Sequence, residues 1–351
     1  MLNAVWQASQ VLWSLHREPE VMSRRCSAYD IEVKGTSVAV DHYEAEADYT
    51  GTMVVIHGMS PKGRRDPRVV QLCYALSKVG FRVLAPEVTS ISELTICPSQ
   101  IRSIADILHV ISNNRQVTPS GNIGVLAPSF SGAMCLAAAS FPEVKEKITA
   151  VCAIGTFTEV ESVISYLLND SNADPYGRFI ILKKIVPLVC EVNDHSLFLG
   201  ALDAAIRDNL NEIVFDEPTN EYHSYLKAET EQNQQKIHRL FNDITYREQL
   251  LSKGKVVLSE EINALNIVQH IHGLTANVFL LHGACDIVIP CDQSETLYRE
   301  LKVLKKNSDL VITPFISHGD TQFRFHQIRD VGKLIKGFAR YFRSIASLST
   351  N

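Results

Sequence analysis

The sequence predicts an α/β protein with a doubly wound, mostly parallel eight-stranded sheet flanked by helices and an inserted helical cap domain. Short β-branched runs alternate with helix-like stretches, an order that implies right-handed βαβ units. Most of the later runs are apolar throughout, which is typical of strands buried on both faces of a parallel sheet. Between about Gly155 and Gly273 strand signals are few and helical, charged segments dominate, which predicts the cap.

The first two predicted strands are separated by Lys34-Gly35 and are expected to form a hairpin at one edge of the sheet. The eight predicted strands are Ala28–Val33, Thr36–Tyr43, Thr52–Ile56, Phe81–Ala85, Asn122–Leu126, Ile148–Ile154, Val278–Leu281 and Asp309–Thr313. The predicted helices are Pro67–Val79, Pro98–Ser112, Ser131–Ala139, Cys291–Leu304 and Gln327–Ile345 in the core, and Ala201–Leu210 and Tyr222–Phe241 in the cap.

These elements divide the chain into an N-terminal helical segment (1–27), a first part of the core (28–155), the helical cap (156–273) and a second part of the core (274–346). The first fifteen residues have no charged side chain and contain both tryptophans, Trp6 and Trp13, seven residues apart and hence on one helical face. Two interpretations stay open: a helix packed on the domain, or an interfacial helix that gives peripheral membrane contact through residues 1–15.

Composition excludes several classes of protein. The 351 residues are 46% hydrophobic and carry 34 Lys and Arg against 39 Asp and Glu, a net charge of −5, so the chain is neither disordered nor fibrous. Interspersed charge and a pI near 6.2 give no electrostatic signature of a nucleic-acid partner. No apolar run reaches the ~18 residues that a membrane-spanning helix needs.

The cysteines and histidines predict no metal site and no cofactor. Eight cysteines are scattered without a C-x-x-C pair, which indicates neither a disulfide framework nor a zinc cluster and favours a reducing, cytoplasmic location. The pair His270-x-His272 has no third ligand at a suitable spacing.

The strongest local signal is Val125-Leu126-Ala127-Pro128-Ser129-Phe130-Ser131-Gly132, which joins an apolar strand to a run rich in alanine and leucine. A serine on a sharp strand-to-helix turn needs small residues two positions away on either side, and Ala127 and Ser131 meet that need. Such a turn raises the Ser129 hydroxyl above the sheet and directs the first N–H groups of the helix toward it. The glycines of the usual G-x-S-x-G pattern are replaced here by other small residues.

Three more segments carry chemistry. His57-Gly58-Met59 ends an early strand, and a glycine there lets the chain turn tightly, so the N–H groups of Met59 and Phe130 are expected to bind an oxyanion. His282-Gly283-Ala284-Cys285-Asp286 places an acid just beyond a late strand, with Asp292 as the competing acid. The next strand is followed by a loop that contains His318, with His326 as the competing histidine. His57 and His282 themselves are expected to be structural.

With these segments the chain resembles the α/β-hydrolase superfamily over about residues 28–155 and 274–346, in the chain order serine, aspartate, histidine. The resemblance implies Ser129 as nucleophile, His318 as general base and then acid, and Asp286 as its orienting partner. It also implies Met59 and Phe130 as oxyanion donors. This agrees with elementary chemistry, because a serine hydroxyl needs an imidazole to accept its proton, and a carboxylate holds that imidazole in the productive tautomer.

The expected activity is therefore hydrolysis of carboxylic esters, on a small-molecule acyl substrate, through an acyl-enzyme. Arg64 and Arg65 follow the oxyanion segment and give a weak indication of acidic substrates; Tyr166 and Tyr176 lie in apolar cap clusters that either line an acyl pocket or form the cap's own core. An acyltransferase or thioesterase with the same three residues stays open, as does a non-catalytic receptor or scaffold of this fold. A serine at position 129 argues against the members of this fold that use an aspartate nucleophile.

Overall fold

The computed structural model describes residues 2–16, 26–215, 219–316 and 328–346. It divides into two compact units, one formed by Met1–Thr158 with Asn266–Asn351 and the other by Glu159–Leu265. The second unit is shorter than the cap expected over 156–273. The 266–273 stretch belongs to the first unit, where the short turns η2 (Ile267–Gln269) and η3 (Ile271–Gly273) bury Ile267 and Ile271.

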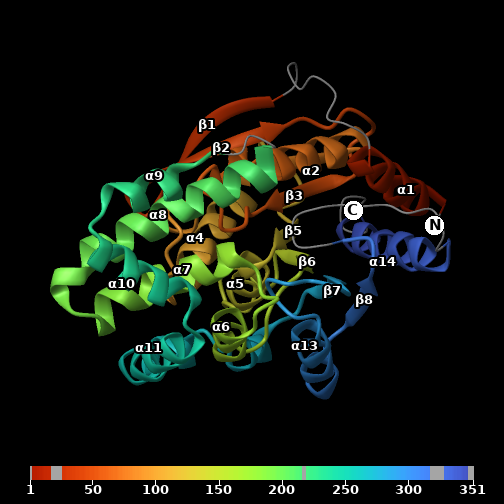
Figure 1. Cartoon of the computed structure of the whole chain (residues 1–351). Helices are drawn as coiled ribbons and strands as arrows, with labels where there is room; N and C mark the ends of the chain where they lie inside the picture. The colour runs from red at the N-terminus through yellow and green to blue at the C-terminus, as the bar shows by residue number, and fades with distance from the viewer. Residues whose placement is uncertain (1, 17–25, 216–218, 317–327, 347–351) are drawn as a thin grey trace. The chain divides into compact units, whose positions relative to one another are not determined.

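The first unit is built on one eight-stranded sheet (Figure 1) in the order β1-β2-β4-β3-β5-β6-β7-β8. The hairpin of β1 and β2 is antiparallel and turns at Lys34 and Gly35, both at positive φ. β2 also pairs antiparallel with β4, and every later pair is parallel. The predicted fold class is confirmed. The strands are β1 (Cys26–Val33), β2 (Thr36–Tyr43), β3 (Gly51–Val55), β4 (Phe81–Pro86), β5 (Ile123–Pro128), β6 (Ile148–Ile154), β7 (Asn277–Gly283) and β8 (Ser308–Thr313).

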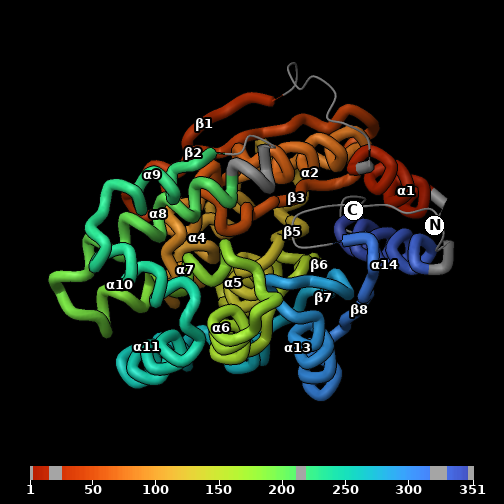
Figure 2. Tube along the Cα trace, viewed as in Figure 1, coloured from red at the N-terminus to blue at the C-terminus, as the bar shows by residue number. Residues whose placement is uncertain are grey.

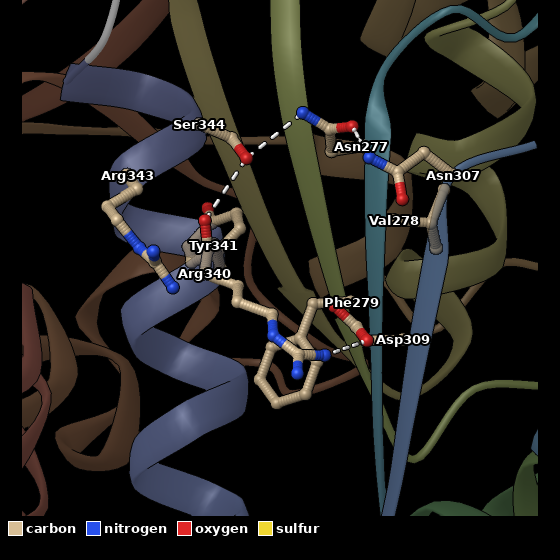
Figure 3. A pocket seen from close by; sticks show the side chains of 9 residues that line it. All are labelled: Asn277, Val278, Phe279, Asn307, Asp309, Arg340, Tyr341, Arg343 and Ser344. Carbon is tan, nitrogen blue, oxygen red and sulfur yellow. Dashed lines mark hydrogen bonds and ion pairs between the residues drawn. The ribbon is translucent and has the colours of Figure 1, made fainter. Parts of the chain in front are cut away.

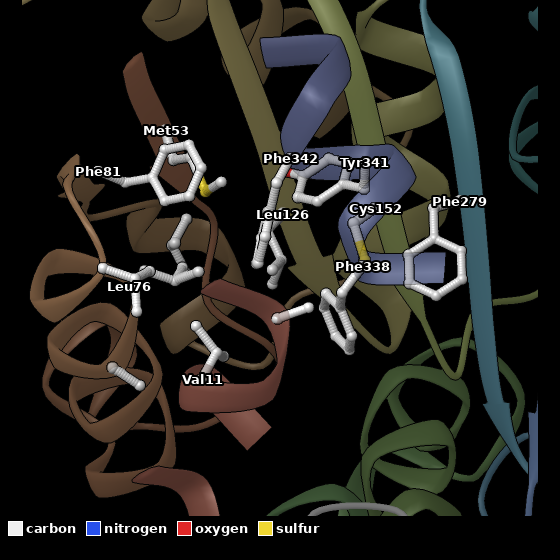
Figure 4. Packing of buried hydrophobic residues seen from close by; sticks show 14 of the residues in the cluster. Val11, Met53, Leu76, Phe81, Leu126, Cys152, Phe279, Phe338, Tyr341 and Phe342 are labelled. Atoms are coloured by element: carbon white, nitrogen blue, oxygen red, sulfur yellow. The ribbon is translucent and has the colours of Figure 1, made fainter. Parts of the chain in front are cut away.

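Helices cover this sheet, and one large apolar cluster (Figure 4) joins three of them to one face. Val11 of α1, Leu76 of α2 and Phe338 of α14 belong to this cluster together with strand residues such as Met53 and Leu126. The intervening strand residues are buried as well, which explains the continuously apolar runs. The helices of this unit are α1 (Leu2–His16), α2 (Pro67–Lys78), α3 (Thr89–Ser92), α4 (Ser99–Asn113), α5 (Phe130–Ala138), α13 (Asp292–Val303) and α14 (Ile328–Ala346), with the 3₁₀ turn η1 (Gly63–Arg65).

Residues Leu2–His16 of the N-terminal segment form α1, which packs on the domain. Ala4, Ala8 and Val11 of α1 are buried against the core. The buried side chain of Gln7 donates to Val79 O at 2.7 Å and to Thr50 Oγ1 at 2.9 Å. These bonds fasten α1 beside the residues that lead into β3 and β4.

The second unit is helical throughout its described part, and the tube in Figure 2 follows its path. The expectation of a single helix over Tyr222–Phe241 is wrong. The chain becomes extended at Glu229, and Thr230 caps a new helix by accepting from the N–H of Asn233. The helices are α6 (Val160–Asn169), α7 (Pro175–Val189), α8 (Val192–Phe215), α9 (Glu221–Ala228), α10 (Glu231–Asn242), α11 (Ile244–Val257) and α12 (Ser259–Ala264).

This unit has its own core. Leu168 and Val186 are fully buried, and a Cβ on Gly254 of α11 would meet Ile185 of α7 at 3.3 Å. The buried guanidinium of Arg247 donates to the carbonyl oxygens of Leu168 and Phe241, both at 2.7 Å. The apolar cap clusters of the sequence therefore supply internal packing. In the described part of the chain, no helix has both the length and the apolar character to cross a bilayer.

Candidate active site

Ser129 occupies a strained backbone position between β5 and α5. Its φ of 58° and ψ of −137° lie where L-residues are rare, and it immediately precedes the first helical residue. Its N–H donates to Ile154 O of the neighbouring strand at 2.6 Å, which fixes the turn to the sheet. The sharp strand-to-helix turn expected from the sequence is therefore present, at the carboxyl end of a central parallel strand.

The turn requires small residues around it. A Cβ added to Gly132 would lie 3.0 Å from Thr156 Oγ1 and 3.1 Å from both Ala127 O and Ala153 Cβ. Two of these neighbours are rigid parts of β5 and β6. Gly132 therefore lets α5 approach the sheet closely.

We expect Gly132→Ala to lower the free energy of unfolding by about 1–3 kcal/mol, because the added methyl group would crowd β5 and β6, which cannot easily move apart. Urea denaturation followed by circular dichroism measures this change. Gly332→Ala is the matched control, since a Cβ there meets nothing within 4 Å. Equal effects of the two substitutions would contradict the close packing of α5.

The segment that carries the expected oxyanion donor lies beside this serine. A Cβ on Gly58 would be 4.0 Å from Ser129 Cβ and 3.6 Å from Pro128 Cγ. The buried hydroxyl of Ser131 donates to His57 O at 2.5 Å and so ties the segment to α5. Phe130, the other expected donor, is buried and stacks on Phe157 with ring centroids 5.8 Å apart. Met59 is half-buried one residue beyond Gly58.

His57 is a structural residue. The N–H of Val88 lies 3.0 Å from its Nε2, and its Nδ1 lies 2.9 Å from Gly58 O. Glu87 Oε1 also lies 3.2 Å from Nε2, while Glu87 Oε2 accepts from Arg64 Nη1 at 3.0 Å. These contacts hold the His57-Gly58 backbone against β4 and keep it in place next to Ser129.

The carboxyl group of Glu87 makes stability depend on pH. Burial alone would raise its pKa, but hydrogen bonds and charge from its partners, first His57, then Ser92 and the Arg64 N–H, outweigh burial and lower the pKa to about 2. A lowered pKa means that the stabilisation is complete above the ordinary value of 4.5 and is lost as pH falls toward 2.

We therefore expect Glu87→Gln to cost up to ~3 kcal/mol of unfolding free energy at pH 7 and progressively less as pH falls from about 4.5 to 3. Urea denaturation of both proteins across this range measures the difference. A difference that stays constant with pH would show that the charge of Glu87 contributes nothing.

Asp286 is held rigidly at the carboxyl end of β7. Its Oδ1 accepts from the N–H groups of Val288 at 2.8 Å and Ile289 at 3.0 Å, and its Oδ2 lies 3.4 Å from His282 Nε2. His282 is buried and structural, because its Nε2 donates to Ile289 O at 2.8 Å and its Nδ1 contacts Ser294 Oγ at 2.6 Å. Asp292, the competing acid, is exposed at the start of α13.

His318 and its competitor His326 lie outside the described residues. The chain that leads toward His318 is described as far as Ile316. β8 ends at Thr313, next to β7, and Phe315 is buried in the core cluster. Ser129 lies at the end of β5 and Asp286 follows β7, two strands of one parallel set, and β8 ends at the same edge of the sheet.

The remaining predicted residues are placed as follows. The Arg64 guanidinium is mostly buried and paired with Asp41 at 3.1 Å and Glu87, whereas Arg65 is 68% exposed and lies 3.9 Å from Asp41. Tyr166 in α6 and Tyr176 in α7 are half-buried within the second unit. Arg64 is thus part of the scaffold around His57.

A polar cavity of about 600 Å³ lies at the other edge of the sheet (Figure 3), where β7 and β8 begin. Asn277, Asn307, Arg340 and Arg343 are among its lining residues. This cavity is separate from Ser129, which follows the carboxyl end of β5. Among the residues that the structure describes, no group of three His, Cys, Asp or Glu side chains gathers to hold a metal.

Sequence reasoning missed three residues that support the site. Ser131 was recognised only as a small residue, yet its hydroxyl donates to His57 O and so ties the strand-to-helix turn at Ser129 (the elbow) to the His57 segment. No sequence motif marked Glu87 or Asp41. Glu87 lies two residues beyond the predicted strand Phe81–Ala85, and such a position at the carboxyl edge of the sheet is a usable signal. Asp41 on the antiparallel β2 has no comparable signal.

No protein-family model matches the chain, and no curated protein does. Solved structures that are similar to it at low sequence identity include the following three. A putative dipeptidyl aminopeptidase IV from Bacteroides ovatus has a TM-score of 0.53 and 12% identity over 93% of this chain and 37% of that one. A 2,6-dihydroxy-pseudo-oxynicotine hydrolase has a TM-score of 0.52 and 12% identity over 92% of this chain and 68% of that one. A puromycin-hydrolyzing peptidase from Mycobacterium tuberculosis has a TM-score of 0.51 and 13% identity over 93% of this chain and 40% of that one.

The chain spans about two fifths of the length of the two peptidases. At these identities the likeness concerns the fold alone. It agrees with the eight-stranded, mostly parallel sheet flanked by helices. The chain therefore has the fold of the α/β-hydrolase superfamily.

Proposed function

We propose that the chain is a serine hydrolase that cleaves carboxylic esters of small molecules through an acyl-enzyme. Ser129 attacks the carbonyl carbon, and the N–H groups of Met59 and Phe130 bind the oxyanion. His318 first takes the serine proton and gives it to the leaving alcohol, then activates water; Asp286 holds its imidazole in the productive tautomer. The imidazole supplies the activation, so the reaction requires no metal or organic cofactor.

The observation that carries this proposal is the backbone of Ser129. The backbone of Ser129 is strained at φ 58°, and its Cβ lies 4.0 Å from the position of a Cβ built on Gly58. Simple helix capping does not require this strained backbone. The side chain of Ser129 makes no capping hydrogen bond to its helix. Strain of this kind persists only where the surrounding structure holds it, and it is concentrated at active sites.

A second candidate is hydrolysis of peptide-like amides, which the similar solved structures favour because two of them are peptidases. The same catalytic residues would act in both reactions. An amide nitrogen is a poorer leaving group than an alcohol oxygen, so it depends more on protonation by the general acid.

The test compares p-nitrophenyl acetate, butyrate and octanoate with aminoacyl p-nitroanilides and an acyl thioester, with and without an alcohol acceptor. We expect ester hydrolysis that Ser129→Ala abolishes. Faster cleavage of the anilides would favour the amide candidate, and faster thioester cleavage or acyl transfer would favour those activities. Hydrolysis that survives Ser129→Ala would overturn the assignment, and a folded protein without turnover on any substrate would favour a receptor.

A further inference from the structure

The outward side of α1 presents both tryptophans, with the polar Ser9 and Gln10 between them. Trp6 is 52% and Trp13 is 48% exposed, although Ala4, Ala8 and Val11 on the opposite side are buried. The bonds of Gln7 fasten this helix to the domain, so its orientation is fixed. Every tryptophan of the chain thus lies on one half-exposed helical face, where such large apolar side chains need an explanation.

The outward side of α14 is cationic. Its exposed positions from Lys333 onward are Lys333, Lys336, Arg340 and Arg343, spaced three or four residues apart and hence on one face. The acids in contact with them are Asp330, 3.0 Å from Lys333, and Asp309, which pairs with Arg340. Lys336 and Arg343 form no ion pair with the described residues. We call these four residues the cationic stripe.

Both features belong to the same side of the molecule. α1 packs against α14 and α2, and all three helices share one apolar cluster on one face of the sheet (Figure 4). Their outward sides therefore point away from that face together. The three helices contain seven Lys and Arg and a single acid, Asp330, in a chain whose net charge is −5.

We propose that this face docks on an anionic lipid bilayer, with Trp6 and Trp13 in the headgroup region and the cationic stripe against the lipid phosphates. Tryptophan combines an apolar body with a polar N–H and favours the membrane–water interface. A single exposed aromatic helix binds weakly, and adjacent cations supply the second signal that stable attachment requires. Charge on α14 and aromatic surface on α1 together match this partner better than either a neutral bilayer or a purely acidic protein.

The experiment is co-sedimentation of the full chain with phosphatidylcholine vesicles, with and without one third phosphatidylserine, at about 0.1 M and about 0.5 M NaCl. We expect binding to the anionic vesicles at the lower salt, little binding to neutral ones, and a loss at the higher salt. Hydrolysis of a soluble ester reports separately on the proposed active site, so failure of one proposal leaves the other testable.

Two double variants separate the contributions. Trp6→Ser with Trp13→Ser removes the aromatic surface, and Lys336→Glu with Arg343→Glu reverses two charges of the stripe. Since each cation near an anionic bilayer contributes about fivefold, the charge variant should bind at least ~20-fold less. The matched controls lie in the second unit: Val256→Ser with Val257→Ser, at residues 77% and 57% exposed, and Lys227→Glu with Lys253→Glu.

Binding that both test variants lose and both controls keep supports the proposal. Absence of binding to anionic vesicles overturns it. If the tryptophan variant still binds the anionic vesicles, the proposal is wrong and the face binds polyanions in general. If the chain does not bind vesicles but forms dimers, and the tryptophan variant abolishes dimer formation, the face binds a second copy of the chain.

Discussion

Replacing Ser129 with alanine is expected to lower kcat/KM for a p-nitrophenyl ester by a factor on the order of 10⁶ while the protein stays folded. The substitution removes the attacking oxygen and leaves the buried neighbours of the turn unchanged. Steady-state kinetics and far-UV circular dichroism measure the two parts of this result. Ser131→Ala is the comparison, because Ser131 donates to His57 O and supports the site without supplying the attacking atom. A Ser129→Ala protein that retains more than a small fraction of activity would contradict its role.

The same position offers a test that does not depend on turnover. At φ 58° an alanine has the same backbone strain as the serine, whereas a glycine adopts this region freely. We expect Ser129→Gly to be more stable than Ser129→Ala by ~1–3 kcal/mol, which reverses the usual order of these two residues. Urea denaturation measures the difference. A more stable alanine variant would show that the turn is not strained.

Replacing Asp286 with asparagine is expected to lower kcat on the order of 10⁴-fold with little change in fold. The amide oxygen can still accept from the N–H groups of Val288 and Ile289, which hold Oδ1. In the proposed mechanism the amide nitrogen would replace an oxygen acceptor of the His318 imidazole and favour its unproductive tautomer. The loss should appear in kcat far more than in KM, as expected for an interaction that matters in the transition state.

Asp292→Asn is the matched control for this substitution. Asp292 lies in the first turn of α13 and is exposed, so its replacement should change kcat less than threefold or so. Thermal unfolding of both variants separates loss of activity from loss of fold. If Asp292→Asn were the inactive variant and Asp286→Asn the active one, the assignment of the acid would be wrong.

The sequence predicted the sheet and the elbow because both leave local signals. Uninterrupted apolar runs identified the parallel strands, and small residues around Ser129 identified a turn that a Cβ at Gly132 would obstruct. The break at Thr230 was missed because the residues before and after it within Tyr222–Phe241 both favour a helix. Only Glu229 and the N-cap residue Thr230 separate the two helices. The support of His57 by Glu87 and Arg64 was missed because these contacts join residues far apart in the chain. Long-range side-chain contacts leave no periodic trace.

The most direct test of the account is to label the protein with a fluorophosphonate and locate the adduct by tandem mass spectrometry. Trypsin releases Ser129 in the 116–145 peptide, which also contains Ser120, Ser131 and Ser140, so fragmentation has to assign the residue. We predict one adduct, on Ser129, which forms slowly or not at all in His318→Ala. An adduct on another residue, or a folded protein that does not react, would contradict the claim that these side chains form a serine-hydrolase site.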